Sequence, residues 1–269
     1  MSRPLIMGVI NVTPDSFSGD GLLQHKDVAE KAASLAHQMI LEGADILDVG
    51  GESSRPGSVL ISAEEEVRRV IPAIEAIKAK VPHAQISVDT FKADVAEQAL
   101  QAGASIVNDI TALAGDSRMA ALVAKTNTTV VLMHNRAMAE GRYDSANYDD
   151  VVTDVAQDLL ASVARAEKSG IARDKIILDP GIGFGKTPQQ NLALITHLKK
   201  IGALGFPLLM GVSRKSFIGK TLDLAIDERL EGTAACVTAC VLNGADILRV
   251  HDVKFMTRVV NMAAALRDA

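Results

Sequence analysis

The chain has 269 residues, of which 48% are hydrophobic and 23% charged, so it can bury one core close to the largest size that a single core reaches. Its 20 glycines and 8 prolines are too few for a collagen-like or low-complexity chain, and its apolar content excludes disorder. A formal net charge of -5 argues against nucleic acid or an anionic membrane as a partner, because both require a basic surface. We therefore expect one globular domain over residues 1–269 with a small-molecule partner.

A cytoplasmic location is expected. The N-terminal apolar stretch is shorter than the hydrophobic region of an export signal, and no run reaches the roughly 20 apolar residues of a membrane span. Cys236 and Cys240 lie four residues apart in an alanine-rich segment, and neither His nor Cys stands beside them at metal spacing. We interpret both cysteines as core residues.

Short apolar runs of strand length alternate with longer segments of helical period along the whole chain, which is typical of repeated βα units. The predicted strands are 5–10, 45–49, 85–89, 105–108, 129–133, 175–179, 207–211 and 246–250. The predicted helices are 27–42, 63–80, 92–101, 117–125, 148–169, 188–201, 229–243 and 254–266. Eight such units in one domain predict a closed (β/α)8 TIM barrel, with an open doubly wound sheet as the alternative.

A barrel places its active site at the carboxyl ends of its strands, and polar residues stand at those positions here. They are Asn11, Asp48, Asp89, Asn108 with Asp109, His134, Asp179, the run from Ser213 to Lys215, and Arg249 with His251. The alternative for each Asp, Asn or Ser is an N-cap of the following helix.

Asp89 and Asp179 end apolar strands, where an unpaired carboxylate is costly, so each requires a hydrogen-bond donor from the protein or from a ligand. Together with the Asn108 amide, they would suit the N–H edge of a nitrogen heterocycle such as a pterin or a purine.

Basic residues at the same edge of the barrel suggest an anionic group on the ligand: Arg55, Arg214, Lys215, Arg249 and His251. The segment from Gly211 to Ser216 follows the seventh strand, where many barrels bind phosphate. Asn11 could add one oxygen ligand for Mg²⁺, which binds few protein oxygens when a diphosphate is present. The alternative for the basic residues is a set of solvated ion pairs.

Glycines follow the sixth strand at Gly181, Gly183 and Gly185, but their spacing to the next Lys-Thr is one residue short of a phosphate loop. We expect them to let the backbone pass close to a ligand while Phe184 offers an aromatic face. Phe17 lies in an early polar loop, where an aromatic side chain could close over a ligand.

Taken together, these motifs resemble the bacterial dihydropteroate synthase family over nearly the whole chain. The opening segment from Gly8 to Ser18 is followed, in the family's order, by DVGGESSRPG from Asp48, SVDT from Ser87, NDI from Asn108, DPGIGFGK from Asp179, SRKSF from Ser213 and RVHDV from Arg249. The resemblance implies a Mg²⁺-assisted transferase that condenses 6-hydroxymethyl-7,8-dihydropterin diphosphate with 4-aminobenzoate, giving 7,8-dihydropteroate and diphosphate. It also implies a homodimer.

The resemblance further implies roles for individual residues, with Lys215, Asp89, Asp179 and Asp20 as the catalytic set. The pterin would be held by Asp89, Asn108, Asp179 and Lys215, and magnesium with diphosphate by Asn11, Arg249 and His251. The aminobenzoate pocket would contain Phe17, Ser54, Arg55, Pro56, Phe184, Lys215 and Ser216. No residue is required as a nucleophile, because loss of diphosphate leaves a pterin-stabilised methylene cation that the arylamine attacks.

Two features depart from the family's usual pattern. The opening loop reads Gly19-Asp20 where the family usually has the acid first, and Ser54 replaces the usual Thr. Two alternatives therefore stay open: a pterin-binding methyltransferase barrel, and a non-catalytic pterin-binding relative that binds without turnover.

Overall fold

The computed structural model describes residues 3–13, 25–52, 60–139 and 147–269. Within these ranges, eight parallel strands form one sheet in the order β6-β5-β4-β3-β2-β1-β8-β7. The strands are β1 (Leu5–Asn11), β2 (Ile46–Gly50), β3 (Gln85–Asp89), β4 (Ile106–Asp109), β5 (Thr129–Met133), β6 (Ile176–Asp179), β7 (Leu209–Met210) and β8 (Ile247–Val250).

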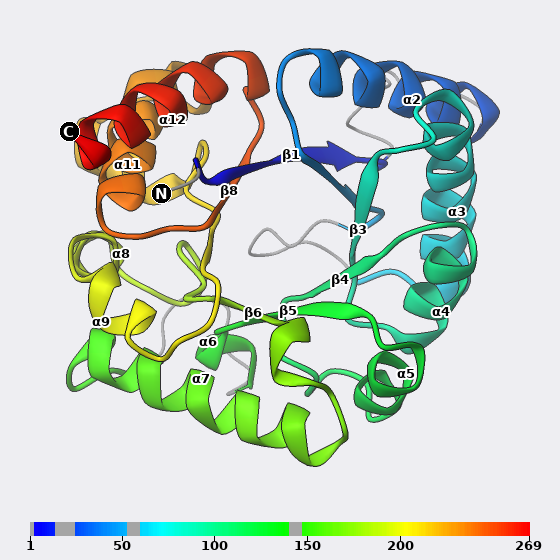
Figure 1. Ribbon diagram of the computed structural model, residues 1–269, viewed down its shortest axis with the longest axis horizontal. Helices are drawn as coiled ribbons and strands as arrows, with labels where there is room; N and C mark the ends of the chain where they lie inside the picture. Colours follow the sequence, from blue (N-terminus) through cyan, green and yellow to red (C-terminus); the bar gives the residue numbers. More distant parts are fainter. Residues whose placement is uncertain (1–2, 14–24, 53–59, 140–146) are drawn as a thin grey trace.

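A single parallel bridge between Leu178 and Leu208 links the two ends of this sheet, so the strands form a nearly closed barrel (Figure 1). The strands otherwise follow the order of the chain, and β1 pairs with β8 as well as with β2. The TIM-barrel prediction is confirmed, and the open doubly wound sheet is excluded.

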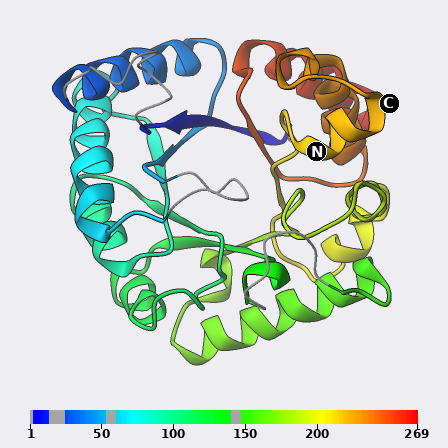
Figure 2. The same cartoon turned by 180° about the vertical axis from the view of Figure 1, so that it is seen from behind.

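The longer helices form an outer ring around the strands, as both views show (Figures 1 and 2). The helices of the described ranges are α2 (His25–Leu41), α3 (Ala63–Lys80), α4 (Ala93–Gln101), α5 (Met119–Thr126), α6 (Arg136–Ala139), α7 (Val151–Lys168), α8 (Pro188–Thr196), α9 (Leu198–Gly202), α10 (Ser216–Leu222), α11 (Leu230–Leu242) and α12 (Val253–Asp268). Capping residues determine where several of these helices begin. In α8, for example, Thr187 and Gln190 form a capping box, which pairs backbone N–H groups that the helix leaves without partners.

Most predicted elements differ from the structure by one to three residues at their ends, α6 and α10 were not predicted, and two predicted elements differ more. The seventh strand is only Leu209–Met210, because Pro207 has no N–H to donate and the Leu208 N–H is bonded to the Asp246 carboxylate at 2.8 Å. The predicted helix 188–201 is divided into α8 and α9 at His197, whose backbone leaves the helical conformation with φ of -103° and ψ of 21°.

The barrel has two apolar layers. A large core packs the outer faces of the strands against the helices, and it includes the buried Cys240, with Cys236 packed at its border. A smaller cluster takes one residue from each of seven strands: Met7, Ile46, Ile106, Val131, Ile177, Leu209 and Ile247. Because alternate side chains of a strand point to opposite faces, this second cluster fills the barrel's interior and closes it as a floor.

Neither cysteine forms a disulfide, which agrees with the expectation of core packing. Across the described ranges no helix is both long and apolar enough to cross a membrane.

Truncation of a floor residue should destabilise the fold. Leu209 is fully buried, so Leu209→Ala should lower the free energy of unfolding by about 3 kcal/mol, through lost burial and the cavity left behind. Urea denaturation followed by circular dichroism measures the change. Leu160→Ala on α7, where the side chain is 45% exposed, is the control and should cost under about 1 kcal/mol. Equal losses in the two variants would contradict the assignment of the floor.

Candidate active site

One layer of the barrel lies two residues beyond the floor on six strands; its polar members, together with Asp89 at the end of β3, are here called the polar layer. Counting two residues from Ile46, Ile106, Val131, Ile177, Leu209 and Ile247 gives Asp48, Asn108, Met133, Asp179, Gly211 and Arg249. Because side chains two residues apart on a strand point to the same face, all six positions face the barrel's interior at its carboxyl end. This is the end at which TIM barrels carry their active sites.

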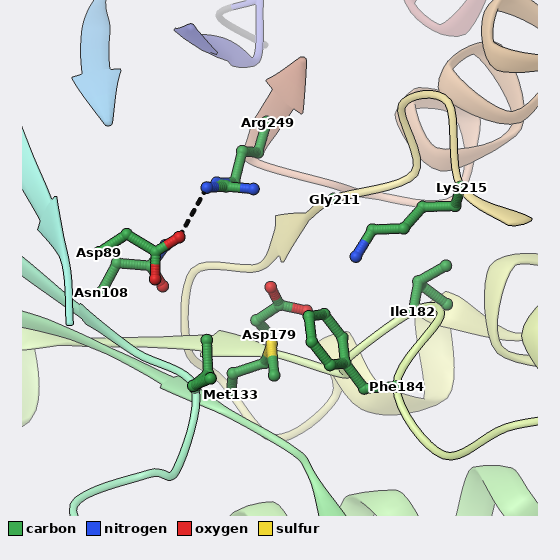
Figure 3. A pocket seen from close by; sticks show the side chains of 10 residues that line it. Asp89, Asn108, Met133, Asp179, Ile182, Phe184, Gly211, Lys215 and Arg249 are labelled. Atoms are coloured by element: carbon green, nitrogen blue, oxygen red, sulfur yellow. Dashed lines mark hydrogen bonds and ion pairs between the residues drawn. The ribbon is translucent and has the colours of Figure 1, made fainter. Parts of the chain in front are cut away.

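A cavity opens on this layer (Figure 3). It brings together six of the predicted site residues from five different strands and the loops after them. The lining residues are Asp89, Asn108, Ile110, Met133, Asp179, Ile182, Phe184, Gly211, Lys215 and Arg249.

Arg249 crosses the polar layer between two carboxylates. Its Nε donates to Asp48 Oδ2 at 2.6 Å and its Nη2 donates to Asp89 Oδ2 at 2.8 Å, the contact drawn in Figure 3. Asp48 also accepts a hydrogen bond from Asn108 Nδ2 at 3.2 Å, and it is fully buried. Asp48 was not among the predicted binding residues, yet it fixes both Arg249 and Asn108.

Three cavity residues each keep an oxygen that no described residue bonds. Asp179 accepts from the Gly181 N–H through Oδ1 at 2.7 Å, which leaves Oδ2. Asp89 uses Oδ2 for Arg249 and leaves Oδ1, and Asn108 uses its amide nitrogen and leaves its side-chain oxygen. Acceptors that line a cavity take donors from water or from a ligand, and a ligand with an N–H edge would supply all three.

Lys215 brings a positive charge to the opposite wall. It stands immediately before α10, and its Nζ lies 4.1 Å from the centre of the Phe184 ring (Figure 3). A cation at this distance is attracted by the face of the ring. The side chain is therefore held toward the cavity by an aromatic face and by the nearby carboxylates.

Burial shifts the acid–base properties of the cavity. It raises the pKa of Asp89 to about 7, although Arg249 opposes the shift, and it raises the pKa of Asp179 above its ordinary value. Burial, together with repulsion from Arg249, lowers the pKa of Lys215 to about 8. Such shifts in one cavity are typical of functional sites.

Three other predicted residues do not line this cavity. Asn11 ends β1, and its side chain makes no hydrogen bond to another described residue. His251 follows β8, and its backbone N–H and ring Nδ1 both lie within hydrogen-bond distance of Ser213 Oγ, at 3.2 and 3.1 Å. Ser216 is the first residue of α10, next to Lys215.

Arg214 points away from this chemistry. Its guanidinium forms a bidentate pair with the Asp252 carboxylate, and its side chain is 44% exposed. For this residue the solvated ion pair was the correct interpretation.

Five predicted residues lie outside the described ranges: Phe17, Asp20, Ser54, Arg55 and Pro56. Conversely, Ile110, Met133 and Ile182 line the cavity without having been predicted, and Gly211 was predicted only as the start of an anion-binding segment. The period-two pattern of the strands could have identified Met133 and Gly211, because both lie two residues beyond a floor residue.

Comparison with known proteins agrees with this geometry. A family model described as pterin binding enzyme matches residues 7–251. The chain is 47% identical to the dihydropteroate synthase of Bacillus subtilis strain 168, over 98% of this chain and 89% of the relative.

Solved structures of the same kind superpose closely. The Xanthomonas albilineans dihydropteroate synthase with 4-aminobenzoic acid has a TM-score of 0.92 at 39% identity, covering 100% of this chain and 94% of that one. The same enzyme in complex with 7,8-dihydropteroate has a TM-score of 0.89 at 38% identity, covering 100% and 95%. The chain therefore belongs to the dihydropteroate synthase family of pterin-binding enzymes.

Proposed function

We propose that this chain joins 6-hydroxymethyl-7,8-dihydropterin diphosphate to 4-aminobenzoate, forming 7,8-dihydropteroate and releasing diphosphate. The observation that carries the proposal is the cavity in which Asp89, Asn108 and Asp179 keep unbonded acceptor oxygens opposite Lys215. Relatives with the same fold bind 4-aminobenzoic acid and 7,8-dihydropteroate, the second substrate and the product of this reaction.

The pterin ring would occupy the polar layer. Asp179 Oδ2, Asp89 Oδ1 and the Asn108 side-chain oxygen would accept hydrogen bonds from the ring's N–H groups, and Lys215 would donate to a ring acceptor. The aminobenzoate would enter between Phe184, Lys215 and Ser216, with Phe17, Ser54, Arg55 and Pro56 as the remaining predicted contacts.

The reaction would proceed by dissociation. The C–O bond to diphosphate breaks, and its electron pair leaves with the diphosphate oxygen. The resulting methylene cation is delocalised into the pterin. The buried Asp179 carboxylate, with the predicted Asp20, would stabilise this positive charge. The arylamine lone pair then forms the C–N bond, and the nitrogen gives up its extra proton to the released diphosphate or to water. The residues contribute charge stabilisation, positioning and exclusion of water rather than a nucleophile.

The leaving group would be held by Asn11, Arg249 and His251. The Arg249 Nη1 makes no hydrogen bond to another described residue, so it is available to a diphosphate oxygen. Within the described ranges, no group of three or more His, Cys, Asp or Glu residues could hold a metal ion by itself. The single amide oxygen of Asn11 fits Mg²⁺ bound mainly through diphosphate and water, and the ion would neutralise charge on the leaving group.

The wider setting follows from the family likeness. We propose one barrel domain over residues 1–269, acting as a homodimer in the cytoplasm, with neither nucleic acid nor membrane as a partner. Exposed apolar side chains at Leu242, Phe255, Met262 and Leu266 on the neighbouring helices α11 and α12 offer a surface for a second copy.

Removing the charge of either Lys215 or Asp179 should strongly reduce turnover. Lys215→Ala and Asp179→Asn should each lower kcat/KM at least about a hundredfold, because each removes a buried group that stabilises transition-state charge. The measurement is diphosphate release with and without 4-aminobenzoate. Lys220→Ala, an exposed lysine on α10, is the control and should behave like the unmodified chain. Tight pterin binding by the unmodified chain without release would instead support the non-catalytic relative.

Pterin binding should depend on pH. As pH falls through about 7, Asp89 gains a proton and can no longer accept two hydrogen bonds, so affinity should decrease. The dissociation constant of the pterin alcohol, which lacks diphosphate, should rise at least about tenfold between about pH 8 and about pH 5.5. Calorimetry measures it. Asp89→Asn should bind weakly with a flatter pH dependence, and a flat dependence in the unmodified chain would count against the role of Asp89.

Magnesium should affect the leaving group rather than the pterin. Chelation of divalent cations should reduce the rate at least about tenfold, and Asn11→Ala should raise the Mg²⁺ concentration for half-maximal rate by about tenfold or more. Binding of the pterin alcohol should not change under chelation. A rate insensitive to chelation would remove Asn11 from the proposed metal site.

A further inference from the structure

A buried ammonium group lies behind the cavity wall, outside the proposed chemistry. Lys186 is 8% exposed and directly follows the 181–185 turn, which carries Phe184. Its Nζ donates to the carbonyl oxygens of Gly181 at 2.9 Å and Phe184 at 3.0 Å, and lies 3.1 Å from His134 Nδ1. Burial lowers the pKa of Lys186 to about 7, and only the charged form, with three hydrogens, can donate to all three of these partners.

This arrangement fixes the tautomer of His134. Because the Asp158 carboxylate can only accept and its Oδ2 lies 2.9 Å from Nε2, the ring hydrogen is on Nε2, and Nδ1 accepts from Lys186. Burial, together with the neighbouring Lys186, lowers the pKa of His134 to about 4, so the ring is neutral. Arg136 also donates to the Asp158 carboxylate. The network therefore runs from the turn through His134 to the Asp158 carboxylate, which is 41% exposed.

The turn requires such support. Gly181, Gly183 and Gly185 have φ of +70°, +81° and +59°, and a Cβ on Gly181 would lie 1.9 Å from the His134 carbonyl oxygen. Glycine loses more conformational freedom on folding than any other residue, so a turn of this composition is costly to hold in one conformation. The buried Asn191 accepts from the Gly183 N–H at 2.7 Å, and Lys186 bonds the carbonyl oxygens of Gly181 and Phe184.

The turn also shapes the cavity directly. The Gly181 N–H occupies one oxygen of Asp179, which decides that the other faces the ligand, and the Phe184 ring lies against Lys215 Nζ (Figure 3). A shift of the Gly181 or Phe184 backbone would therefore move a wall of the pocket.

We propose that Lys186, oriented by His134, is a positioning residue that holds the 181–185 turn so that Phe184 forms the aminobenzoate wall beside Lys215. This role rests on the proposed function. Lys186 does not line the cavity, so it acts through the turn rather than on the substrates.

Lys186→Met tests the role, because it keeps the length of the side chain and removes its donors. We expect the KM for 4-aminobenzoate to rise at least about tenfold while kcat changes less, as the loss of buried hydrogen bonds loosens the wall. In the protein without substrates, amide hydrogen exchange in a peptide covering residues 181–187 should accelerate by about tenfold or more. Lys220→Met, on the exposed face of α10, is the matched control for both measurements.

A pair of variants at His134 separates positioning from general stability. His134→Asn keeps an oxygen near the position of Nδ1 that can accept from Lys186, whereas His134→Gln extends toward Asp158 and loses that acceptor. We expect His134→Asn to retain a low KM for 4-aminobenzoate and His134→Gln to raise it. This comparison also decides the matter if Lys186→Met does not fold.

The inference is overturned if a folded Lys186→Met has an unchanged KM and unchanged exchange, or if the two His134 variants behave alike. Hydrogen exchange requires no turnover, so it distinguishes this inference from the proposed function. Accelerated exchange in Lys186→Met, with an unmodified chain that forms no product, would support the turn's dependence on Lys186 and reject the synthase activity.

Discussion

The site depends on one guanidinium held between two carboxylates. Arg249 reaches from β8 to Asp48 on β2 and Asp89 on β3, across a polar layer in which Asp48 is fully buried. Uncompensated, these carboxylates would be very costly at this depth, whereas a paired arrangement with good geometry is tolerated. By bonding one oxygen of Asp89 and leaving the other, Arg249 also decides which acceptor a ligand meets. The bonds of Arg249 therefore serve two purposes, because they compensate the buried carboxylates and also determine which oxygen of Asp89 a ligand can reach.

The floor of the barrel gives this layer its height and orientation. An apolar residue from each of seven strands closes the interior, and the next inward position on six of those strands belongs to the site layer, as cavity lining or, for Asp48, as its support. Because alternate residues of a strand face the same side, the next inward residue after each apolar floor residue lies one layer closer to the carboxyl end of the barrel, where the polar side chains stand. The glycine-rich turn 181–185 forms one wall of the cavity, and Lys186 donates hydrogen bonds to two carbonyl oxygens of this turn. Recognition thus rests on rigid strands, and a single turn completes it.

Much of this could be predicted from the sequence, because strand and helix periods are local and the carboxyl ends of eight strands must converge in a barrel. That reasoning identified Asp89, Asn108, Asp179 and Lys215, which now share one cavity. It did not identify the pairing of Arg249 with Asp48, because the two residues are 201 positions apart and only the closed sheet brings them together. Lys186 was recognised only as part of a glycine motif, since its three partners depend on how the turn folds against His134. Long-range partners of buried charges were thus the part that local patterns could not supply.

We propose that the unbonded oxygens of the polar layer bind the pterin ring. A crystal structure of the chain with the pterin alcohol bound tests it most directly. We expect ring N–H groups within hydrogen-bond distance of Asp179 Oδ2 and the Asn108 side-chain oxygen, with Arg249 still bonded to Asp48. A ring bound elsewhere, or one seated in the cavity with these oxygens still lacking donors, would contradict it.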